Sequence, residues 1–506
     1  MYVWGVAKRQ GNGLWLRHRW FESSHPSQIE FLTSGGYPAC FLSVHEWGEC
    51  VKDLGVLVMA AGKGTRMRSA LPKVLHPVLD RPMLDYLLRG VACCGAEATA
   101  VLVGSGGDQV EAHLKERFPE VEVLWQREQL GTAHAVLTAM SWWERFKTVV
   151  VLNGDLPMMR PESLRSLLER CRTEGPDCAV ISFVARDPGA YGRVLRTESG
   201  VRVVEYRDAS AEQRRMNEVN AGCYVFRTSA LRGVIERIGN RNAQGEYYLP
   251  DALSLMAEEG RRVEAYPMPE AEMMGVNTQA ELAHASALMR DRIAAFWMER
   301  GVRMTDPASA WIGPDVELAQ DVVLMPNVQL WGCSRVGEGS FIGSGSILTN
   351  AVLGRGVTLA AHVLIEDSEM KDFSKAGPFV YIRDGCCLAE RAFAGKFVEL
   401  KKTTVGQGSK VPHLSYLGDA TLGLGVNIGA GTITCNYDGR EKHPTKIGDH
   451  CFVGSDTMFV APVTMGNGAA TAAGSVITEP VPDGALGVGR ARQRNIDGWA
   501  SRRAKD

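Results

Sequence analysis

A glycine-rich loop followed by two positive side chains is the first part of the chain whose residue types could do chemistry. Gly62 and Gly64, within Leu57–Met67, lack side chains, so backbone N–H groups can approach a phosphate or a base closely. Arg66 and Lys73 lie seven residues apart and offer two cations to a triphosphate, which suits nucleotidyl transfer. The loop lacks the third glycine of a dinucleotide-binding loop and the ending of a P-loop. The alternative is a pair of surface cations without a ligand.

Asp155 is a second candidate, within the run Asn-Gly-Asp-Leu-Pro. It follows the β-branched stretch Thr148–Leu152, and open α/β sheets bind their ligands beyond the carboxyl ends of the strands. Mg²⁺ accepts one or two protein oxygens and completes its shell with substrate phosphates, so a carboxylate here predicts a metal ligand. The alternative is that Asp155 only forms a turn.

His413 is a third candidate, because several lysines surround it in the sequence, among them Lys396, Lys401 and Lys410. A histidine can take a proton from an amine that attacks a thioester, and neighbouring cations suit an anionic sugar phosphate. This pattern favours a general base over the alternative, a histidine with a structural role.

The elements that carry the first two candidates alternate between short apolar runs and helical patterns. Strands are predicted at Gly55–Ala60, Thr99–Val103, Val121–Trp125 and Thr148–Leu152, with helices at Met83–Cys93, Gln109–Arg117, Thr132–Trp143 and Pro161–Arg172. Strands separated by helices predict an α/β domain built on a parallel sheet with crossover connections.

A long helix is predicted from Gln279 to about Arg300. Thr278 and Glu281 form a capping box at its start, and Gly301 is placed to end it. Apolar residues recur at helical spacing at Leu282, Ala285, Met289, Ile293 and Phe296. Such a helix is well suited to linking two domains.

Beyond Pro307 the apolar period becomes six residues, and many of the chain's 55 glycines fall in this part. One run comprises Ile447, Val453, Phe459, Met465, Thr471 and Ile477; others comprise Val316, Val322 and Val328, then Val336, Ile342 and Leu348, then Leu422, Ile428 and Thr434. A hexad of this kind predicts a β-helix, in which each turn stacks one residue inside. An antiparallel domain with a period of two is the alternative, and glycine after the apolar position favours the hexad. Solenoids commonly associate into symmetric oligomers.

Composition limits the classes of protein. A length of 506 residues predicts about two to four domains. The formal charge of −2 gives no case for nucleic acid, and no apolar run approaches the roughly 18 residues of a membrane span. Twelve scattered cysteines without an export signal favour reduced thiols in the cytosol. Residues 1–54 show no sustained period, so we expect either a small regulatory tail or, more readily, an upstream-translated segment before a start near Val51.

The candidates form part of a larger resemblance. The runs Leu57–Met67 and Leu71–Leu75 resemble the signature of nucleotidyltransferases that make sugar nucleotides. Further matches follow in order: Gln126–His134, Asn153–Pro157, Tyr191–Arg193, Glu205, Asn220, Gln244–Tyr248 and Gly275–Asn277. This part is similar to the uridylyltransferase half of the bifunctional UDP-N-acetylglucosamine pyrophosphorylase/glucosamine-1-phosphate N-acetyltransferase family (GlmU family).

That resemblance implies roles for individual residues. UTP and UDP-N-acetylglucosamine contacts would come from Ala60, Ala61, Gly62, Gly64, Lys73, Gln126, Gly131, Thr132, Gly192, Glu205, Asn220 and Asn277. Asp155 and Asn277 would bind Mg²⁺, and Arg66 and Lys73 would neutralise charge during the reaction.

The last third resembles the acetyltransferase half of the same family, through Lys396–Lys402, Gly408–Lys410, His413–Ala420 and Asn427–Gly439. The resemblance makes His413 the base. It implies sugar-phosphate contacts by Arg383, Lys401, Tyr416, Asn427 and Lys442, and acetyl-CoA contacts by Ala430, Asn436, Tyr437, Ser455, Ala473 and Arg490. The sequence departs from the family pattern at Asp384, where the family usually has proline, at Lys396, where it usually has asparagine, and at Val411-Pro412.

The resemblance covers about residues 55–500 and implies a Rossmann-like uridylyltransferase domain (55–278), a linker helix (279–303) and a left-handed parallel β-helix with a tail (304–506). It implies a cytoplasmic bacterial homotrimer that uses Mg²⁺, acetyl-CoA and UTP and supplies cell-wall, peptidoglycan and lipopolysaccharide synthesis. Neither nucleic acid nor membrane is an expected partner. Two alternatives are a uridylyltransferase with a structural β-helix and a non-catalytic subunit of a regulatory assembly. Arg66, Lys73, Asp155 and Asn277 together argue against the second.

Overall fold

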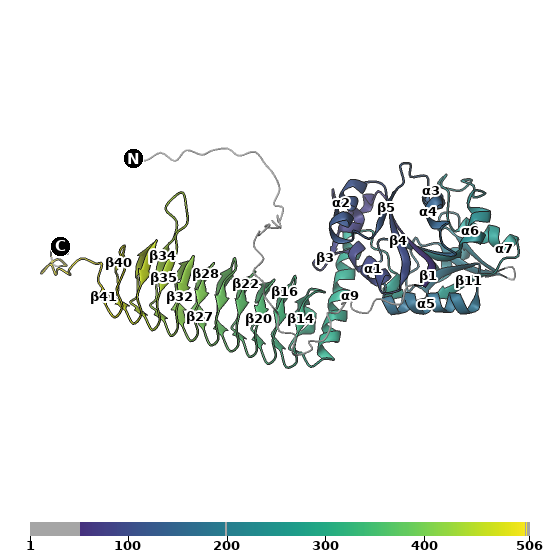
Figure 1. Ribbon diagram of the computed structural model, residues 1–506. Helices are drawn as coiled ribbons and strands as arrows, with labels where there is room; N and C mark the ends of the chain where they lie inside the picture. Colours follow the sequence, from purple (N-terminus) through teal and green to yellow (C-terminus); the bar gives the residue numbers. More distant parts are fainter. Residues whose placement is uncertain (1–50, 198–199, 501, 503–506) are drawn as a thin grey trace. The chain divides into compact units, whose positions relative to one another are not determined.

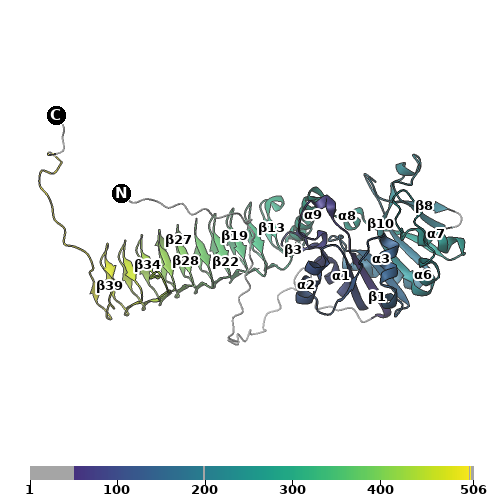
Figure 2. The same cartoon turned by 90° about the horizontal axis from the view of Figure 1, so that it is seen from above.

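The computed structural model describes residues 51–197, 200–500 and 502 of the chain. Helices and a mixed sheet occupy the part before the long helix α9 (Gln279–Met298), and short strands in regular rows follow it (Figures 1 and 2). Residues 1–50, most of the segment 1–54 that shows no sustained period, lie outside the described residues.

The first part is a sheet of nine strands. Seven of them have the order β11-β7-β10-β6-β1-β4-β5, and the other two, β8 and β9, form a hairpin that pairs with β10 through β8. Its strands are β1 (Val51–Ala60), β4 (Ala96–Val103), β5 (Glu122–Trp125), β6 (Thr148–Asn153), β7 (Cys178–Val184), β8 (Arg193–Thr197), β9 (Gly200–Val204), β10 (Glu218–Arg227) and β11 (Val263–Pro267). Strands β5, β4, β1 and β6 are parallel, as predicted. The sheet as a whole is mixed, because β10 runs antiparallel to both β6 and β7.

Helices cover both faces of this sheet because its central strands are apolar on both sides. In β1, Val56 and Val58 belong to one buried cluster and Leu57 to the other. The first cluster includes side chains of α1 (Met83–Ala92), α2 (Gly107–Arg117) and α5 (Pro161–Glu174). The second includes side chains of α3 (Thr132–Thr138), α4 (Met140–Trp143), α6 (Thr228–Ile235) and α7 (Asp251–Glu258).

Several predicted boundaries were wrong, among them the start of β4, which is Ala96 and not Thr99. Strand β1 begins at Val51, not Gly55, and Leu54 is buried within the sheet, so residues 51–54 belong to the fold. The single helix expected over Thr132–Trp143 is divided into α3 and α4 at Ala139, whose ψ of 9° departs from the helical value.

Helix α9 (Gln279–Met298) confirms the predicted capping box, since Thr278 and Glu281 exchange both hydrogen bonds. Its buried side chains are Ala285, Met289, Ile293, Ala294 and Trp297. The helix ends two residues earlier than expected, and Gly301 follows with a φ of +91°. None of the described helices is long and apolar enough to cross a bilayer.

The second part is a parallel β-helix that runs from β12 (Arg303–Met304) to β41 (Leu486–Gly487). Its strands, two to four residues long, stack into three parallel sheets of 11, 10 and 9 strands. The predicted hexads are confirmed: Val453 and Phe459 are fully buried, as are Val316, Val322 and Val328. One loop, residues 436–444, projects between β34 (Ile433–Cys435) and β35 (Thr445–Ile447) (Figure 1).

Two candidate active sites

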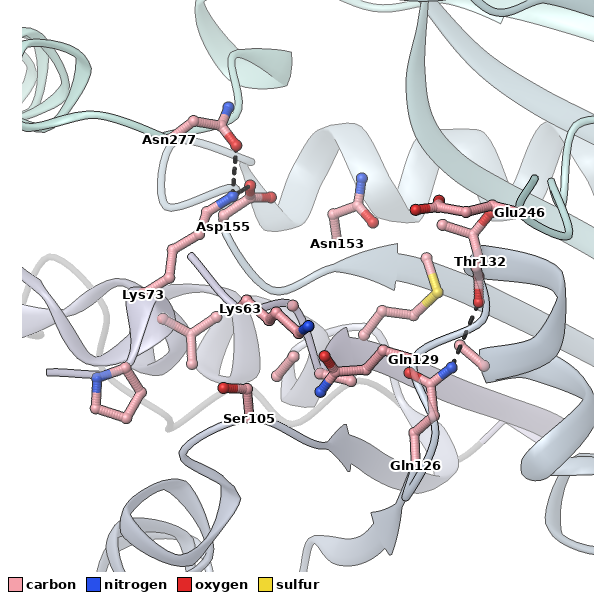
Figure 3. Close-up of a pocket in the computed structure, with 18 residues that line it drawn as sticks. Lys63, Lys73, Ser105, Gln126, Gln129, Thr132, Asn153, Asp155, Glu246 and Asn277 are labelled. Atoms are coloured by element: carbon pink, nitrogen blue, oxygen red, sulfur yellow. Dashed lines mark hydrogen bonds and ion pairs between the residues drawn. The ribbon is translucent and has the colours of Figure 1, made fainter. Parts of the chain in front are cut away.

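A cavity of about 510 Å³ lies at the carboxyl ends of β1 and β6. The residues that Figure 3 labels as Ser105, Gln126 and Gln129 face Asp155 and Asn277 across it. Nine of the residues assigned to nucleotide or metal line it: Ala60, Ala61, Gly62, Lys73, Gln126, Gly131, Thr132, Asp155 and Asn277. The edge of the sheet where parallel strands end is therefore also the edge where the predicted residues gather.

Lys73 links the two predicted metal ligands. Its ammonium donates to Asp155 Oδ2 and, at 2.6 Å, to Asn277 Oδ1 (Figure 3). Asn277 Oδ1 also accepts a hydrogen bond from Arg66 Nη2 at 2.9 Å. The two side-chain oxygens thus already converge on one cation, which is the property that a Mg²⁺ site of one carboxylate and one amide requires.

Gly131 has a φ of +121°, and a Cβ there would lie 2.5 Å from the Tyr247 carbonyl oxygen. The loop can therefore pass Tyr247 only without a side chain. The next residue, Thr132, accepts a hydrogen bond from the Leu249 N–H at its hydroxyl oxygen (2.9 Å). Gln126, only 4% exposed, directs its amide nitrogen to the Gly131 carbonyl oxygen at 3.4 Å. These contacts fix one wall of the cavity.

A second cavity, of about 250 Å³, shares Thr132, Asn153, Asp155 and Asn277 with the first. It is lined by the three residues assigned to the sugar, Gly192, Glu205 and Asn220. A Cβ at Gly192 would lie 3.2 Å from Glu205 Oε1, so glycine leaves room for this carboxyl group. Burial raises the pKa of Glu205, and the nearby carboxylates of Asp208, Asp251 and Glu246 raise it further.

The β-helix carries the second site along one of its corners. Lys396 at the end of β27 (Phe393–Lys396) lies in register with His413 at the end of β30 (Lys410–His413). Continuing that register from coil to coil puts Ala430, Ser455 and Ala473 in the same column, since Asp456 N–H donates to the Ala430 carbonyl and Gly474 N–H to that of Ser455. The proposed base and three of the acetyl-CoA residues thus form one row.

Three cations gather at the other end of the neighbouring sheet. Arg383 in β25 (Tyr381–Arg383) lies in register with Lys401 in β28 (Glu399–Lys401). The loop 436–444 brings Lys442 beside Lys401, and this neighbouring positive charge, more than burial, lowers the pKa of the Lys401 ammonium. Adjacent ammonium groups of this kind suit a phosphate.

Two further predicted residues of this half, Tyr416 and Asn427, lie in different sheets, whereas Tyr437 lies in the loop 436–444 and Arg490 follows β41. Tyr416 begins β31 (Tyr416–Gly418), in register with Glu399, and Asn436 donates to the Asp419 carboxylate at the following corner. Asn427 instead lies in β33 (Asn427–Ile428), in the sheet that precedes the His413 corner. Within one chain, Asn427 therefore lies in a different sheet from Arg383 and Lys401.

Comparisons with known proteins gave matches to both halves of the chain. The MobA-like NTP transferase domain family matches residues 56–303, and the hexapeptide repeat of succinyl-transferase matches residues 335–366 and 444–479. The bifunctional protein GlmU of Heliobacterium modesticaldum is 43% identical over 453 residues, which are 89% of this chain and 98% of that relative. The bifunctional protein GlmU of Thermus thermophilus is 45% identical over 449 residues, 88% of this chain and 98% of that relative.

The chain belongs to the GlmU family of bifunctional proteins. Its first part is a Rossmann-like nucleotidyltransferase domain and its second is the left-handed β-helix of hexapeptide-repeat acyltransferases. A solved structure of UDP-glucose pyrophosphorylase with UDP-glucose matches 49% of this chain and all of that chain, at 19% identity and a TM-score of 0.40.

Within this GlmU-family chain, two predicted residues lie outside the cavity linings. Gly64 has a φ of +57° and packs against Lys73, whose Cβ would be 2.9 Å from a Cβ at position 64. Arg66 reaches the site only through Asn277. Ser105, Gln129 and Glu246 also line the first cavity and were not predicted as site residues, although Gln129 and Glu246 fall within the motifs Gln126–His134 and Gln244–Tyr248.

Proposed function

We propose that this protein makes UDP-N-acetylglucosamine in two steps, by acetylating glucosamine-1-phosphate with acetyl-CoA and then transferring UMP from UTP to the product. The observation that carries the proposal is that one chain holds both groups of residues, the Lys73–Asp155–Asn277 contacts beside a cavity and, on the β-helix, His413 with the cluster of Arg383, Lys401 and Lys442. In this proposal the first domain comprises residues 55–278, to which β1 adds residues 51–54, the linker comprises residues 279–303 and the second domain residues 304–506.

In the acetylation, Arg383, Lys401 and Lys442 bind the phosphate of glucosamine-1-phosphate, with Tyr416 and Asn427 completing the contacts. The amine nitrogen of the sugar attacks the thioester carbonyl, and His413 takes the proton that this nitrogen loses. The carbon–sulfur bond then breaks, and CoA leaves as the thiol. Ala430, Asn436, Tyr437, Ser455, Ala473 and Arg490 contact acetyl-CoA.

In the uridylyl transfer, a phosphate oxygen of N-acetylglucosamine-1-phosphate attacks the α-phosphorus of UTP in line, and pyrophosphate leaves. Arg66 and Lys73 neutralise charge on the phosphates, while Gln126, Gly131 and Thr132 hold the nucleotide. Gly192, Glu205 and Asn220 hold the sugar. Asp155 and Asn277 would bind Mg²⁺, which supplies further charge neutralisation on the phosphates. Lys73 then exchanges its contacts with these oxygens for contacts with the triphosphate.

The acetylation site requires more than one chain in this proposal. Asn427 belongs to a different sheet from Arg383 and Lys401, so a neighbouring β-helix completes the sugar-phosphate contacts in a homotrimer. Exposed Phe379, Phe397 and Leu414 beside His413 support such an association, because they form an apolar row across adjacent coils. The protein works in the bacterial cytoplasm and supplies precursor for cell-wall, peptidoglycan and lipopolysaccharide synthesis.

Acetyl transfer tests the first step. Purified protein with glucosamine-1-phosphate and acetyl-CoA is expected to release CoA thiol, and His413→Ala to abolish the release while pyrophosphate formation continues. Pyrophosphate formation from UTP and N-acetylglucosamine-1-phosphate without any thiol release would leave a uridylyltransferase with a structural β-helix.

Pyrophosphate release tests the second step. Asp155→Asn retains the shape of the side chain but removes its charge, and we expect uridylyl transfer to fall at least about a hundredfold, as losing a charged transition-state contact does. Acetyl transfer is the internal control for folding. Full pyrophosphate release by the variant would exclude Asp155 as a metal ligand, and absence of both reactions in the unmodified protein would favour a scaffold.

A further inference from the structure

The cation cluster of the β-helix contains an anion from the chain itself. Oδ2 of Asp384 lies 3.0 Å from Arg383 Nη1 and 3.7 Å from Lys401 Nζ, so one carboxylate oxygen bridges two of the three cations. The other edge of the Arg383 guanidinium donates to Glu399 Oε1, at 3.0 Å from Nε and 2.7 Å from Nη2. The oxygen of Asp384 thus makes the contacts that a phosphate oxygen would make there.

The backbone holds Asp384 at this position. It has a φ of +58° at the corner that follows β25, a conformation that aspartate and asparagine tolerate better than most residues. Its side chain is 40% exposed, whereas those of Arg383 and Lys401 are 25% and 16% exposed. The carboxylate is therefore on the open side of the two cations that it contacts.

We propose that Asp384 is a specificity-determining residue of the sugar-phosphate site, a carboxylate that occupies the place of a phosphate oxygen and weakens the binding of phosphates. This inference rests on the proposed acetylation, in which Arg383, Lys401 and Lys442 bind the phosphate. A phosphate must displace Asp384 from Arg383 and Lys401 and then remain close to its negative charge, because the carboxylate cannot leave the corner. Both effects raise the KM for the sugar phosphate above the value that the cations alone would give.

The test is Asp384→Asn in the full-length protein, since asparagine keeps the size of the side chain and the backbone conformation. At saturating acetyl-CoA, the KM for glucosamine-1-phosphate is expected to fall about fivefold, the size of one like charge removed from a partly exposed site. Inhibition by inorganic phosphate should strengthen by a similar factor. The kcat for acetyl transfer, the KM for acetyl-CoA and uridylyl transfer should stay unchanged.

Asp367→Asn is the matched control. Asp367 has a φ of +45° at the equivalent corner one coil earlier, and its carboxylate accepts from Asn350 Nδ2 at 2.9 Å. Asp367→Asn removes the same charge from the same kind of turn. The KM of this variant for glucosamine-1-phosphate should therefore not change. An equal fall in both variants would show a general charge effect and would overturn the inference.

A rise or no change in KM for Asp384→Asn would also overturn it, because Asp384 would then orient Arg383 or do nothing. Calorimetric binding of glucosamine-1-phosphate separates this result from the proposed function. Tighter binding by Asp384→Asn that disappears in Asp384→Asn/Lys401→Met supports the inference even if no acetyl group is transferred. The missing acetyl transfer would then contradict only the proposed acetylation. Unchanged binding would contradict the inference while active acetyl transfer leaves the proposed function intact.

Discussion

The carboxyl group of Glu205 combines a half-buried position with three acidic neighbours, Asp208, Asp251 and Glu246. Burial first, and then these charges, raise its pKa above the ordinary value of 4.5. A raised carboxyl pKa means that the ionised group destabilises the folded state above the unfolded pKa, and that this cost disappears as the pH falls through the folded pKa. Ionisation of this carboxyl group in the proposed sugar site therefore costs stability, as functional groups often do.

Glu205→Gln should separate the effect of this carboxyl group on stability from its effect on sugar binding. The variant is expected to raise the thermal midpoint at pH 8, with a gain that shrinks as the pH falls through the raised pKa. Its KM for N-acetylglucosamine-1-phosphate should rise about tenfold, because a charged hydrogen-bond acceptor is lost. The acid limb of kcat/KM for uridylyl transfer, where the unmodified protein protonates Glu205, should flatten. A lower midpoint at pH 8 would contradict the assigned pKa direction.

Two glycines of the first cavity differ in what an added methyl group would meet. A Cβ at Gly131 would collide with the Tyr247 backbone, whereas no described atom lies within 4 Å of one at Gly62. Gly131→Ala is therefore expected to destabilise the domain by about 2 kcal/mol, from strain at positive φ and the displaced loop. Gly62→Ala should leave the thermal midpoint unchanged and still raise the KM for UTP, because its methyl group enters the cavity. Equal midpoints for both variants would refute the argument.

At the scale of elements, the start of α9 also fixes a candidate metal ligand. The carboxylate of Glu281 accepts hydrogen bonds from the Asn277 N–H at 2.6 Å and the Thr278 N–H at 2.9 Å. The capping box that begins the linker helix thus orients the residue whose side chain meets Lys73. Helix and site are coupled through two adjacent backbone groups.

Glu281→Ala should raise the Mg²⁺ concentration needed for half-maximal uridylyl transfer by about threefold to tenfold, because losing this cap costs about 1 kcal/mol and frees Asn277 to move. Glu281→Gln keeps an oxygen acceptor and is expected to restore most of the Mg²⁺ dependence. Acetyl transfer should remain unchanged in both. An effect on thermal stability alone, with the same Mg²⁺ dependence, would show that the cap is only structural.

Local patterns predicted the elements better than their pairing. The hexads identified the buried residues of the β-helix because each coil repeats the same short-range environment, and the capping box marked the start of α9. The antiparallel insertion of β10 between β6 and β7 depends on pairing over long sequence separations, for which no local period exists. Likewise, Lys73 was recognised as a cation, but its contacts with Asp155 and Asn277 join residues 82 and 204 positions apart.

At the scale of the whole molecule, the two groups of site residues lie in different architectures, one in the mixed sheet with its helices and the other in the β-helix. Among the described residues, those that line the first cavity run from Met59 to Asn277, whereas His413 and the cations Arg383, Lys401 and Lys442 all belong to the β-helix. Their different surroundings explain why each reaction can serve as the internal control for variants of the other. Association of chains is expected to matter for one reaction only.

Phe397→Glu tests that expectation. Phe397 is 57% exposed and stacks on Phe379 with ring centroids 5.2 Å apart, one coil from Leu414 and the adjacent His413. A charge in this apolar row should prevent its burial between chains, so the mass in light scattering should fall from about 165 kDa, three times 55.1 kDa, toward 55.1 kDa. Acetyl transfer should then be lost while uridylyl transfer continues.

Phe373→Glu is the matched control for this change. Phe373 also has positive φ at a corner of the β-helix, but Arg355 and Arg391 flank its ring and it lies outside the row of Phe379 and Phe397. We expect that variant to keep both the mass and the two activities. Acetyl transfer that persists in a monomeric Phe397→Glu variant would mean that Asn427 of a neighbouring chain is dispensable, and that the cations and His413 of one β-helix suffice for the reaction.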